Sequence, residues 1–229
     1  MSWFGKYLKS SVGAKHLMAI TGLMLVGFVF AHMLGNLQIF KGQDAINSYA
    51  VKLQGLGPLL WVMRAGIIIA FVLHIYSAIR LVLMNRAARP VKYKKVKNDK
   101  SSFASRTMIY GGITVALFLV FHLMQLTLGG GPLPENFNLV DALGRHDVYN
   151  MTVLGFQNPA VAGAYVVAML ALAIHLSHGV TSLFQSLGLS HPKYNGMIKM
   201  AGPAVGTLVF LGNSSMPIAV LAGIVKATV

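Results

Sequence analysis

The chain has 229 residues, of which 55% are hydrophobic and only 10% are charged, and it contains no cysteine. Soluble domains carry about 25% charged residues, so this composition argues against an ordinary soluble globular domain. Without cysteine the chain cannot form disulfides, thiolate-held iron–sulfur clusters or a covalent c-type haem attachment. Five acidic residues are too few to favour a multi-carboxylate metal centre or a paired-carboxylate hydrolase. The net charge of +14 is not accompanied by a basic fold with interleaved aromatic residues, so no nucleic-acid partner is expected.

Five long apolar runs follow one another along the chain. A helix needs about 20 residues to cross the hydrocarbon core of a bilayer, and each run is long enough. The predicted spans are residues 16–38, 58–84, 106–128, 159–187 and 201–225, with an external loop over 129–158. The first run contains a histidine and lacks a small-residue cleavage pattern, so we interpret it as a retained span. The sequence therefore predicts an all-α integral membrane protein, a bundle of five transmembrane helices in a single domain over 1–229.

Basic residues are distributed unequally between the two sides of the predicted membrane. Thirteen of the 19 Lys and Arg residues precede the first span or lie in the two loops on the same side. The longest basic segment contains Arg86, Arg89, Lys92, Lys94, Lys95, Lys97, Lys100 and Arg106. By the positive-inside rule, the N-terminus and this polybasic loop are cytoplasmic and the C-terminus is outside. The loop is a topology signal with affinity for anionic membrane lipid, or a docking surface for a cytoplasmic partner.

Four of the five predicted spans contain histidine, which is costly inside a membrane and usually functional there. These residues are His32, His74, His122 and His175, and His178 lies one helical turn after His175. At 1.5 Å per residue, His32 and His122 lie roughly 24–26 Å from the cytoplasmic edge, and the other pair lies roughly 15–18 Å from it. Two imidazoles on facing helices can fill both axial positions of a haem iron. The sequence thus predicts two stacked haem b groups as cofactors.

The role of His178 has two alternatives. Because His178 faces the same way as His175, either residue can be the ligand, and the other can bond to a haem propionate or a quinone. Depth favours His175 as the ligand. Near the span ends, Arg64, Arg80 and Arg106 are candidates for propionate contacts, or are interfacial charges that extend towards the headgroups.

Three segments carry an ordered pattern of specific residues. The first joins 18–23, 32–37 and 46–49, the second joins 104–108 to 121–122, and the third covers 175–188. In these segments the chain resembles the single-anchor, two-haem b558-type cytochrome b subunit of succinate dehydrogenase and fumarate reductase (respiratory complex II). The resemblance covers nearly the whole chain. It implies that His32 and His122 bind the distal haem and that His74 and His175 bind the proximal haem.

The resemblance also implies partners and a reaction. A flavoprotein subunit with covalent FAD and an iron–sulfur subunit would dock on the cytoplasmic side of the bacterial inner membrane, beside the proximal haem. Electrons from succinate would pass through flavin, clusters and haems to a quinone, usually menaquinone in this type, and the reverse path would reduce fumarate. The chain would be the anchor and electron-transfer subunit and would not act on succinate by itself. A higher oligomer of the complex is compatible with this assignment.

One position departs from the family pattern. Some relatives have an acidic residue in the first external loop, where Gln54 stands in the comparable stretch and cannot titrate. Asp44 is the one carboxylate of that loop, so Gln54 and Asp44 are the candidates for quinone contacts.

Two other functions compete with this assignment: a di-haem anchor of another membrane dehydrogenase, and a non-haem transporter. No acidic residue lies within a predicted span and the halves show no inverted repeat, which disfavours the transporter.

Overall fold

The computed structural model describes residues 2–88, 101–131 and 137–228. Its elements are α1 (Trp3–Lys9), α2 (Ser11–Asn36), the 3₁₀ helix η1 (Leu37–Lys41), α3 (Gln43–Gln54), α4 (Pro58–Ala87), α5 (Phe103–Leu126), α6 (Val148–Gln157), α7 (Pro159–Ser186) and α8 (Asn195–Leu221). Five helical segments, α2 with η1, α4, α5, α7 and α8, are long and apolar enough to cross a membrane. Within the described ranges the β-structure is an isolated bridge between Val140 and His146. The predicted all-α fold is therefore confirmed for the described residues, with five helices long and apolar enough to span a membrane, and the orientation of the termini stays a prediction.

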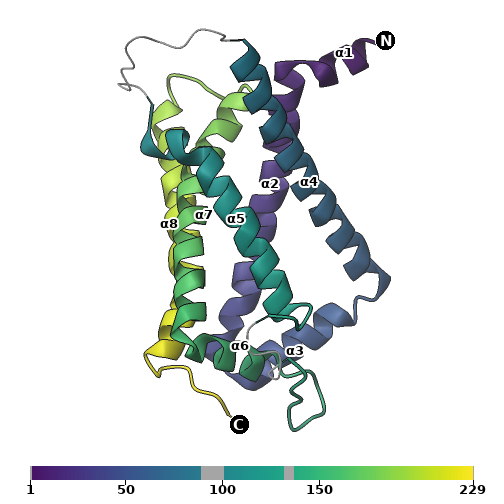
Figure 1. Ribbon diagram of the computed structural model, residues 1–229, viewed down its shortest axis with the longest axis vertical. Helices are drawn as coiled ribbons and strands as arrows, with labels where there is room; N and C mark the ends of the chain where they lie inside the picture. The colour runs from purple at the N-terminus through teal and green to yellow at the C-terminus, as the bar shows by residue number, and fades with distance from the viewer. Residues whose placement is uncertain (1, 89–100, 132–136, 229) are drawn as a thin grey trace.

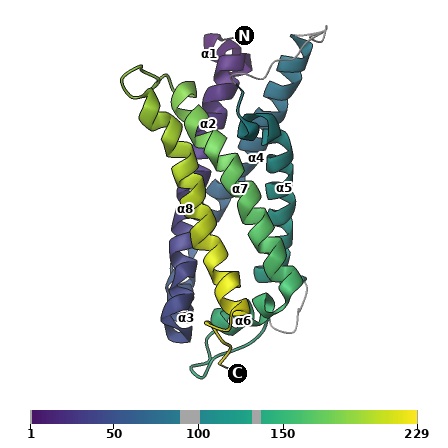
Figure 2. The same ribbon diagram turned by 90° about the vertical axis from the view of Figure 1, so that its left-hand side faces the viewer.

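The long helices form an elongated bundle with the two chain termini at opposite ends (Figure 1). Helix α7 packs most extensively against α8, α2 against α4, and α5 against α7. Short helices lie at the ends of the bundle: α1 at one end, α3 and α6 together at the other (Figure 2). We call these the N-terminal end and the C-terminal end of the bundle. The polybasic residues between 89 and 100 lie outside the described residues.

Two long helices begin at proline, and in each the preceding residue has a conformation or a hydrogen bond that favours the start of a helix. Asn158 precedes Pro159 of α7, and its side-chain oxygen accepts from the backbone N–H of Ala160 at 3.0 Å. Gly57 precedes Pro58 of α4 and has a φ of +54°, a conformation that favours glycine. These signals fix where both spans begin, and both beginnings coincide with the predicted positions.

Helix α8 differs most from its predicted range, because it covers Asn195–Leu221 and not 201–225. It continues as one helix through the polar residues at its centre. Asn213 donates to the carbonyl of Val209 at 2.9 Å, so this side chain is satisfied within its own helix. Gly223 has a φ of +70° and follows the end of the helix, as glycine commonly does.

The close packing of α7 against α8 depends on two glycines. A Cβ atom at Gly202 would collide with the carbonyl oxygen of Ser177, and one at Gly206 would collide with that of Ala173. Small residues allow two membrane helices to bring their backbones into contact. This pair of helices therefore forms the tightly packed side of the bundle.

Buried apolar side chains concentrate at the C-terminal end of the bundle. They come from η1, α3, α6, α7 and α8 and include Ile39, Ile46, Val153, Phe156, Tyr165 and Met216. Helix α6 buries six of its ten residues, whereas α5, among its described residues, buries Gln125 alone. The predicted external loop thus contains a packed helix that covers one end of the bundle.

Candidate functional site

The four span histidines form two pairs, each across two different helices. The ring centroids of His32 in α2 and His122 in α5 are 5.8 Å apart, with their planes at 89°. Those of His74 in α4 and His175 in α7 are 6.4 Å apart, with their planes at 64°. We call His32 with His122 the distal pair, which lies towards the C-terminal end, and His74 with His175 the proximal pair. The structure brings together the same pairs that the depths in the sequence grouped.

Two glycines show how far the pairs are separated along the bundle. A Cβ atom at Gly22 in α2 would lie 3.3 Å from Cε1 of the α4 histidine, and one at Gly112 in α5 would lie 3.5 Å from Cε1 of the α7 histidine. The absence of a side chain at both positions leaves room for the proximal rings. The distal histidines of α2 and α5 each lie ten residues further along their helix. At 1.5 Å per residue, about 15 Å separates the two pairs along the bundle.

The distances within the pairs fit an iron atom between the rings. With a metal–nitrogen bond of about 2 Å and about 1 Å from nitrogen to ring centre, imidazoles on opposite sides of one metal have centroids about 6 Å apart. The measured separations, 5.8 and 6.4 Å, lie on either side of this value. In the part of the chain that the structure describes, no group of three or more metal-binding side chains occurs. A haem suits such pairs, because its own nitrogens fill four positions and the protein supplies two.

The proximal His74 is oriented by the backbone of α2. Its Nδ1 lies 3.2 Å from the carbonyl oxygen of Met18 and 3.3 Å from the hydroxyl of Thr21. A carbonyl oxygen can only accept, so Nδ1 carries the proton and Nε2 keeps its lone pair. Metal-binding histidines usually have this arrangement, in which the other ring nitrogen donates to a protein oxygen.

The distal His122 is oriented by a side chain. Its Nδ1 lies 3.1 Å from the hydroxyl of Tyr165, and that hydroxyl donates to Oε1 of Gln125 at 3.1 Å. Because the phenol has a single hydrogen, it accepts from Nδ1–H and leaves Nε2 free. Phe118 and Phe156 pack edge-on against the ring of Tyr165, with centroids 4.9 and 4.8 Å away, and fix its position.

The other two paired histidines, His32 and His175, have different hydrogen-bond partners from each other. Nε2 of His32 lies 3.0 Å from the side-chain nitrogen of Asn36, one turn further along α2, so Asn36 has to release this nitrogen before it can bind iron. Nδ1 of His175 is buried and has no hydrogen bond of good geometry among the described residues, and the backbone carbonyl of Met108 is the acceptor that interacts with this ring. A buried polar nitrogen with so weak a partner is unfavourable.

His178 does not take part in either ring pair. Its Nε2 lies 3.0 Å from the hydroxyl of Ser182, one turn further along α7. His175 is the residue whose ring lies 6.4 Å from His74. The structure therefore pairs the ring of His175, and not that of His178, with the ring of His74.

Each of the three candidate arginines contacts another part of the chain. Arg80 donates to two carbonyls at the end of α1, one of them at 2.7 Å. Arg106 donates to the backbone carbonyl two residues before α5, at 2.8 Å. The guanidinium of Arg64 lies 4.9 Å from the ring centroid of Trp61, within the range of a cation–π contact. None of these contacts involves the four paired histidines.

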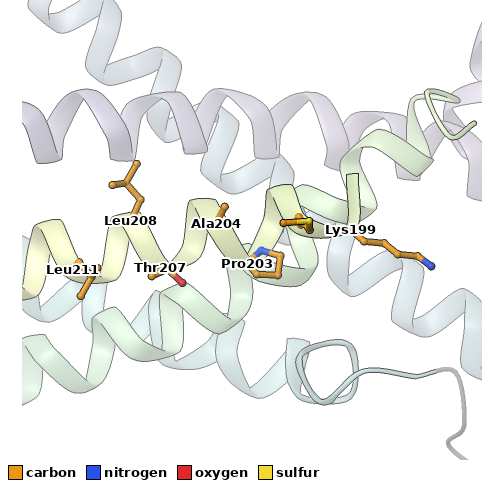
Figure 3. A pocket seen from close by; sticks show the side chains of 7 residues that line it. Lys199, Pro203, Ala204, Thr207, Leu208 and Leu211 are labelled. Atoms are coloured by element: carbon orange, nitrogen blue, oxygen red, sulfur yellow. The ribbon is translucent and has the colours of Figure 1, made fainter. Parts of the chain in front are cut away.

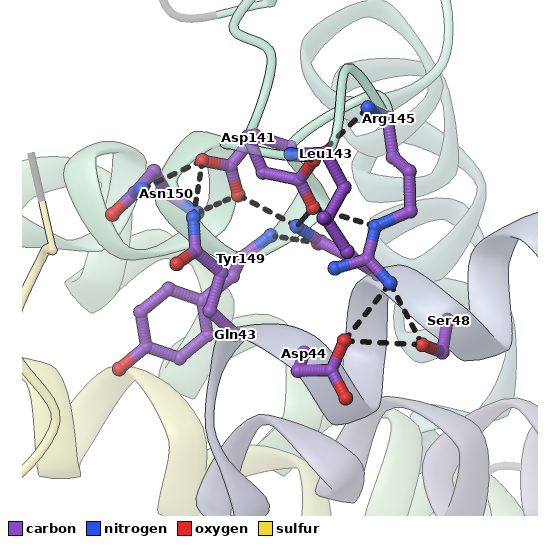
Figure 4. Close-up of polar contacts among 10 residues, drawn as sticks. Gln43, Asp44, Ser48, Asp141, Leu143, Arg145, Tyr149 and Asn150 are labelled. Carbon is purple, nitrogen blue, oxygen red and sulfur yellow. Dashed lines mark hydrogen bonds and ion pairs between the residues drawn. The ribbon is translucent and has the colours of Figure 1, made fainter.

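The candidate quinone residues lie in α3, at the C-terminal end. Asp44 forms an ion pair with Arg145 at 2.9 Å, and Arg145 also binds Asp141 at 2.7 Å (Figure 4). Gln54 is exposed at the other end of α3. Ten residues, about 15 Å of helix, separate it from Asp44, so the structure does not bring the two candidates together.

Buried polar side chains connect α3, the loop before α6, and α6 itself. Asp147 caps α6 and accepts from Asn47 at 3.1 Å, from Gln43 at 2.8 Å and from the side chain of Asn150 at 2.6 Å (Figure 4). Loss of hydration would raise the pKa of Asp147, but these hydrogen bonds outweigh it and lower the pKa. The network therefore holds a charged carboxylate in a covered position at the C-terminal end.

Asp141 is stabilised in the same way. Loss of hydration would raise its pKa, but the backbone N–H of Arg145, the amide of Asn47, the guanidinium of Arg145 and the backbone N–H of Leu143 lower the pKa to about 2. The pKa of Arg145 is raised, chiefly by its hydrogen bond to Asp141. The network is structural at neutral pH, because these charges stay fixed.

Two surface grooves lie along the long helices, and neither has a histidine among its described lining residues. One groove of about 530 Å³ lies along α8 (Figure 3), and its lining includes Lys199, Pro203, Thr207, Leu208 and Leu211. Another of about 340 Å³ lies between α5 and α7, and its lining includes Thr114, Phe118, Phe121 and Ala164. Both are largely apolar, as expected for surfaces that face acyl chains. The candidate site is therefore the interior of the bundle.

Two residues of the site, Tyr165 and Gln125, did not emerge from the sequence analysis. The hydrogen bond between Tyr165 and His122 joins residues 43 positions apart, and such contacts leave no local pattern. A polar Gln125 within an apolar span was the one signal that could have drawn attention to this position.

No family model, curated protein or solved structure matches this chain. Its function is therefore inferred from the two histidine pairs, from the hydrogen bonds that orient them and from the sequence pattern. The family assignment stays a prediction.

Proposed function

We propose that this chain is the di-haem cytochrome b subunit that anchors a succinate:quinone oxidoreductase in the bacterial cytoplasmic membrane. The supporting observation is that two histidine pairs, with ring centroids 5.8 and 6.4 Å apart, lie at two depths of one apolar bundle. Each pair would supply the two imidazole nitrogens that a b-type haem needs from the protein. The resemblance in three sequence segments supports the complex II assignment over another dehydrogenase.

In this proposal the distal pair holds one haem and the proximal pair holds the other. Bound haem supplies reversible one-electron transfer between ferric and ferrous iron. With one imidazole from each histidine of a pair bound to the iron, neither oxygen nor a substrate would have access to the metal. The chain's own residues orient the ligands: Tyr165 accepts the Nδ1 proton of His122, and the carbonyl of Met18 accepts that of His74. The apolar helices around the pairs exclude water.

The positions of the pairs and of the basic residues support a route for electrons along the bundle, in either direction. Most of the described basic residues outside the spans lie at the N-terminal end of the bundle. They include Lys6, Lys15, Arg86, Arg106 and Lys193. By the positive-inside rule this end is cytoplasmic. The flavoprotein and iron–sulfur subunits would then dock near the proximal pair. A quinone, menaquinone in this type, would exchange electrons near the distal pair.

The experiment that tests this proposal has two stages. First, the purified chain is assayed by a dithionite-reduced minus oxidised spectrum and by pyridine haemochrome, with an expected content of two b-type haems per chain. No haem in a folded preparation would contradict electron transfer and leave the transporter as the better explanation. Second, the complex is purified by a tag on this chain and treated with succinate. Haem reduction by succinate together with covalent flavin identifies complex II, whereas reduction by another donor alone identifies a different dehydrogenase.

A further inference from the structure

The short helix α1 extends outward from the N-terminal end of the bundle and does not continue the axis of α2 (Figure 1). The side chain of Ser10 caps both the end of α1 and the beginning of α2. The hydroxyl of Ser10 donates to the carbonyl of Tyr7 at 2.6 Å and accepts from the backbone N–H of Gly13 at 3.0 Å. A Cβ atom at Gly13 would collide with the carbonyl oxygen of Tyr7, so the corner between the helices requires glycine.

Two further contacts hold α1 against the bundle. Arg80 of α4 donates to the carbonyl of Leu8 at 2.7 Å and also to that of Lys9, which satisfies carbonyls that a helix end leaves without partners. Its positive charge also lies at the negative end of the helix dipole. The hydroxyl of Tyr7 is hydrogen-bonded to Nδ1 of His16 in α2. A helix of seven residues is not stable alone in water, so these contacts are what maintain its position.

The surface of α1 is amphipathic. Trp3 is 78% exposed and Leu8 is 41% exposed, and at 100° per residue they lie on the same half of the helix. Lys6 and Lys9 are also exposed, and they lie on the opposite half. Tryptophan is favoured at the membrane–water boundary, and lysine can extend its ammonium group to the headgroups. This combination is typical of a helix that lies in the plane of the interface.

The height of α1 along the bundle agrees with such a location. Arg80, which binds the end of α1, lies seven residues before the end of α4 at Ala87. At 1.5 Å per residue this position is about 10 Å from the end of α4, and the long arginine side chain extends from there to the end of α1. Helix α1 therefore meets the bundle at its N-terminal end, where the first span begins (Figure 1).

Charge identifies the kind of lipid. The described acidic residues, Asp44, Asp141 and Asp147, all lie at the opposite end of the bundle, in α3 and in the loop before α6. None of these described carboxylates lies near the exposed lysines of α1 at the N-terminal end. We propose that α1 is an interfacial helix that binds anionic phospholipid, with Trp3 and Leu8 against the acyl chains and Lys6 and Lys9 on the headgroup phosphates. This assignment does not depend on haem or on a dehydrogenase partner.

The experiment uses Trp3 as a fluorescent probe. The chain has two tryptophans, so Trp61→Phe leaves Trp3 as the single tryptophan reporter in this chain. This variant is reconstituted into vesicles of phosphatidylcholine, with or without phosphatidylglycerol, in which one lipid carries bromine high or low on its acyl chains. We expect blue-shifted Trp3 emission and a large loss of intensity with bromine near the headgroup. Brominated phosphatidylglycerol should quench more than brominated phosphatidylcholine, and aqueous iodide should quench little.

The opposite result has a clear meaning. Strong quenching by iodide without quenching by brominated lipid would place α1 in water, as a docking surface for a soluble protein, and would overturn the proposal. The variant Lys6→Gln/Lys9→Gln should keep quenching by brominated phosphatidylcholine and lose the preference for phosphatidylglycerol. A preference that survived this change would show that the lysines do not select the lipid.

A second comparison tests how α1 is held. Arg80→Gln should lower the emission anisotropy of Trp3 and reduce its preference for shallow bromine, because the end of α1 is no longer bound to α4. Arg106→Gln is the matched control, since that guanidinium lies at the same end but binds the backbone before α5. An unchanged Trp3 signal in Arg80→Gln, in protein with wild-type helicity, would contradict the role of Arg80. Should Arg80→Gln not fold, the lysine variant still decides the lipid proposal.

Discussion

The hydroxyl oxygen of Tyr165 lies 3.1 Å from Nδ1 of His122 and donates its hydrogen to Gln125. The direction of this short chain is fixed, because Oε1 of Gln125 can only accept. A histidine of the distal pair is thereby held as the tautomer that presents a free Nε2. In the proximal pair the backbone carbonyl of Met18 does the same for His74, and a side-chain substitution cannot remove this acceptor.

Tyr165→Phe should change the distal haem alone. Loss of the acceptor makes His122 a weaker electron donor, so the distal midpoint potential should become more positive and haem affinity should fall by roughly 10–100-fold. The proximal potential should stay constant. A potentiometric titration of both haems measures this. Tyr110→Phe is the matched control, because Tyr110 is 73% exposed on α5, and identical potentials in both variants would contradict the role of Tyr165.

Single replacements of the paired histidines should separate the two haems. His122→Ala should leave about one haem per chain, with the spectrum of the proximal site, and His175→Ala should leave the distal one, because a b-type haem loses its site when one axial ligand is removed. His178→Ala is the control and should keep both, since its ring contacts Ser182. Pyridine haemochrome and low-temperature spectra measure the content. Loss of both haems from His122→Ala in folded protein would show that the pairs are not independent sites.

The sequence was sufficient for the long helices and for the grouping of the histidines. A run of 20 or more apolar residues is a local feature of the sequence. Depth along a helix is obtained by counting residues, so His32 and His122 could be grouped without knowledge of how their helices pack. The hydrogen bonds of the site were not accessible in this way. Tyr165 reaches His122 because α5 and α7 are neighbours, and helix neighbours are a property of the whole bundle.

The extramembrane helices were missed for a different reason. Helix α3 is amphipathic but short, and α6 lies within a stretch that begins with three glycines, which predicts a loop. Both helices depend on buried polar contacts such as that between Asn47 and Asp147, which join residues 100 positions apart. A contact between residues so far apart in the sequence produces no local pattern from which it could be predicted.

Gly206→Leu should separate α7 from α8. The new side chain would meet the backbone of Ala173, and overpacking of this kind costs about 1–3 kcal/mol or more. A lower thermal midpoint in detergent, measured by circular dichroism, is the expected result. Gly163→Leu in α7 is the matched control, because no atom lies within 4 Å of the position of its Cβ, and it should leave the midpoint nearly unchanged. Equal effects of the two substitutions would rule out close packing at Gly206.

Acid should destabilise the protein through the carboxylates at its C-terminal end. The pKa of Asp141 is about 2 and that of Asp147 is also below the ordinary 3.8, so both bind protons more weakly in the folded state. Their contribution to stability is fully present above about pH 4 and is lost as the pH falls towards 2. Thermal midpoints measured between pH 7 and pH 2 should decline over this window.

Asp147→Asn tests the same network at neutral pH. The substitution removes a buried charge that accepts from Asn47, Gln43 and Asn150, and each hydrogen bond to a charged group contributes about 1.5–3 kcal/mol. We expect a loss of at least about 2 kcal/mol at pH 7 and a smaller further decline in acid, because one of the two titrating carboxylates is gone. Asp44→Asn is the control: its side chain is 82% exposed, so its pair with Arg145 contributes less than about 1 kcal/mol. If Asp147→Asn kept both the wild-type midpoint at pH 7 and the full decline in acid, the network would not stabilise the C-terminal end.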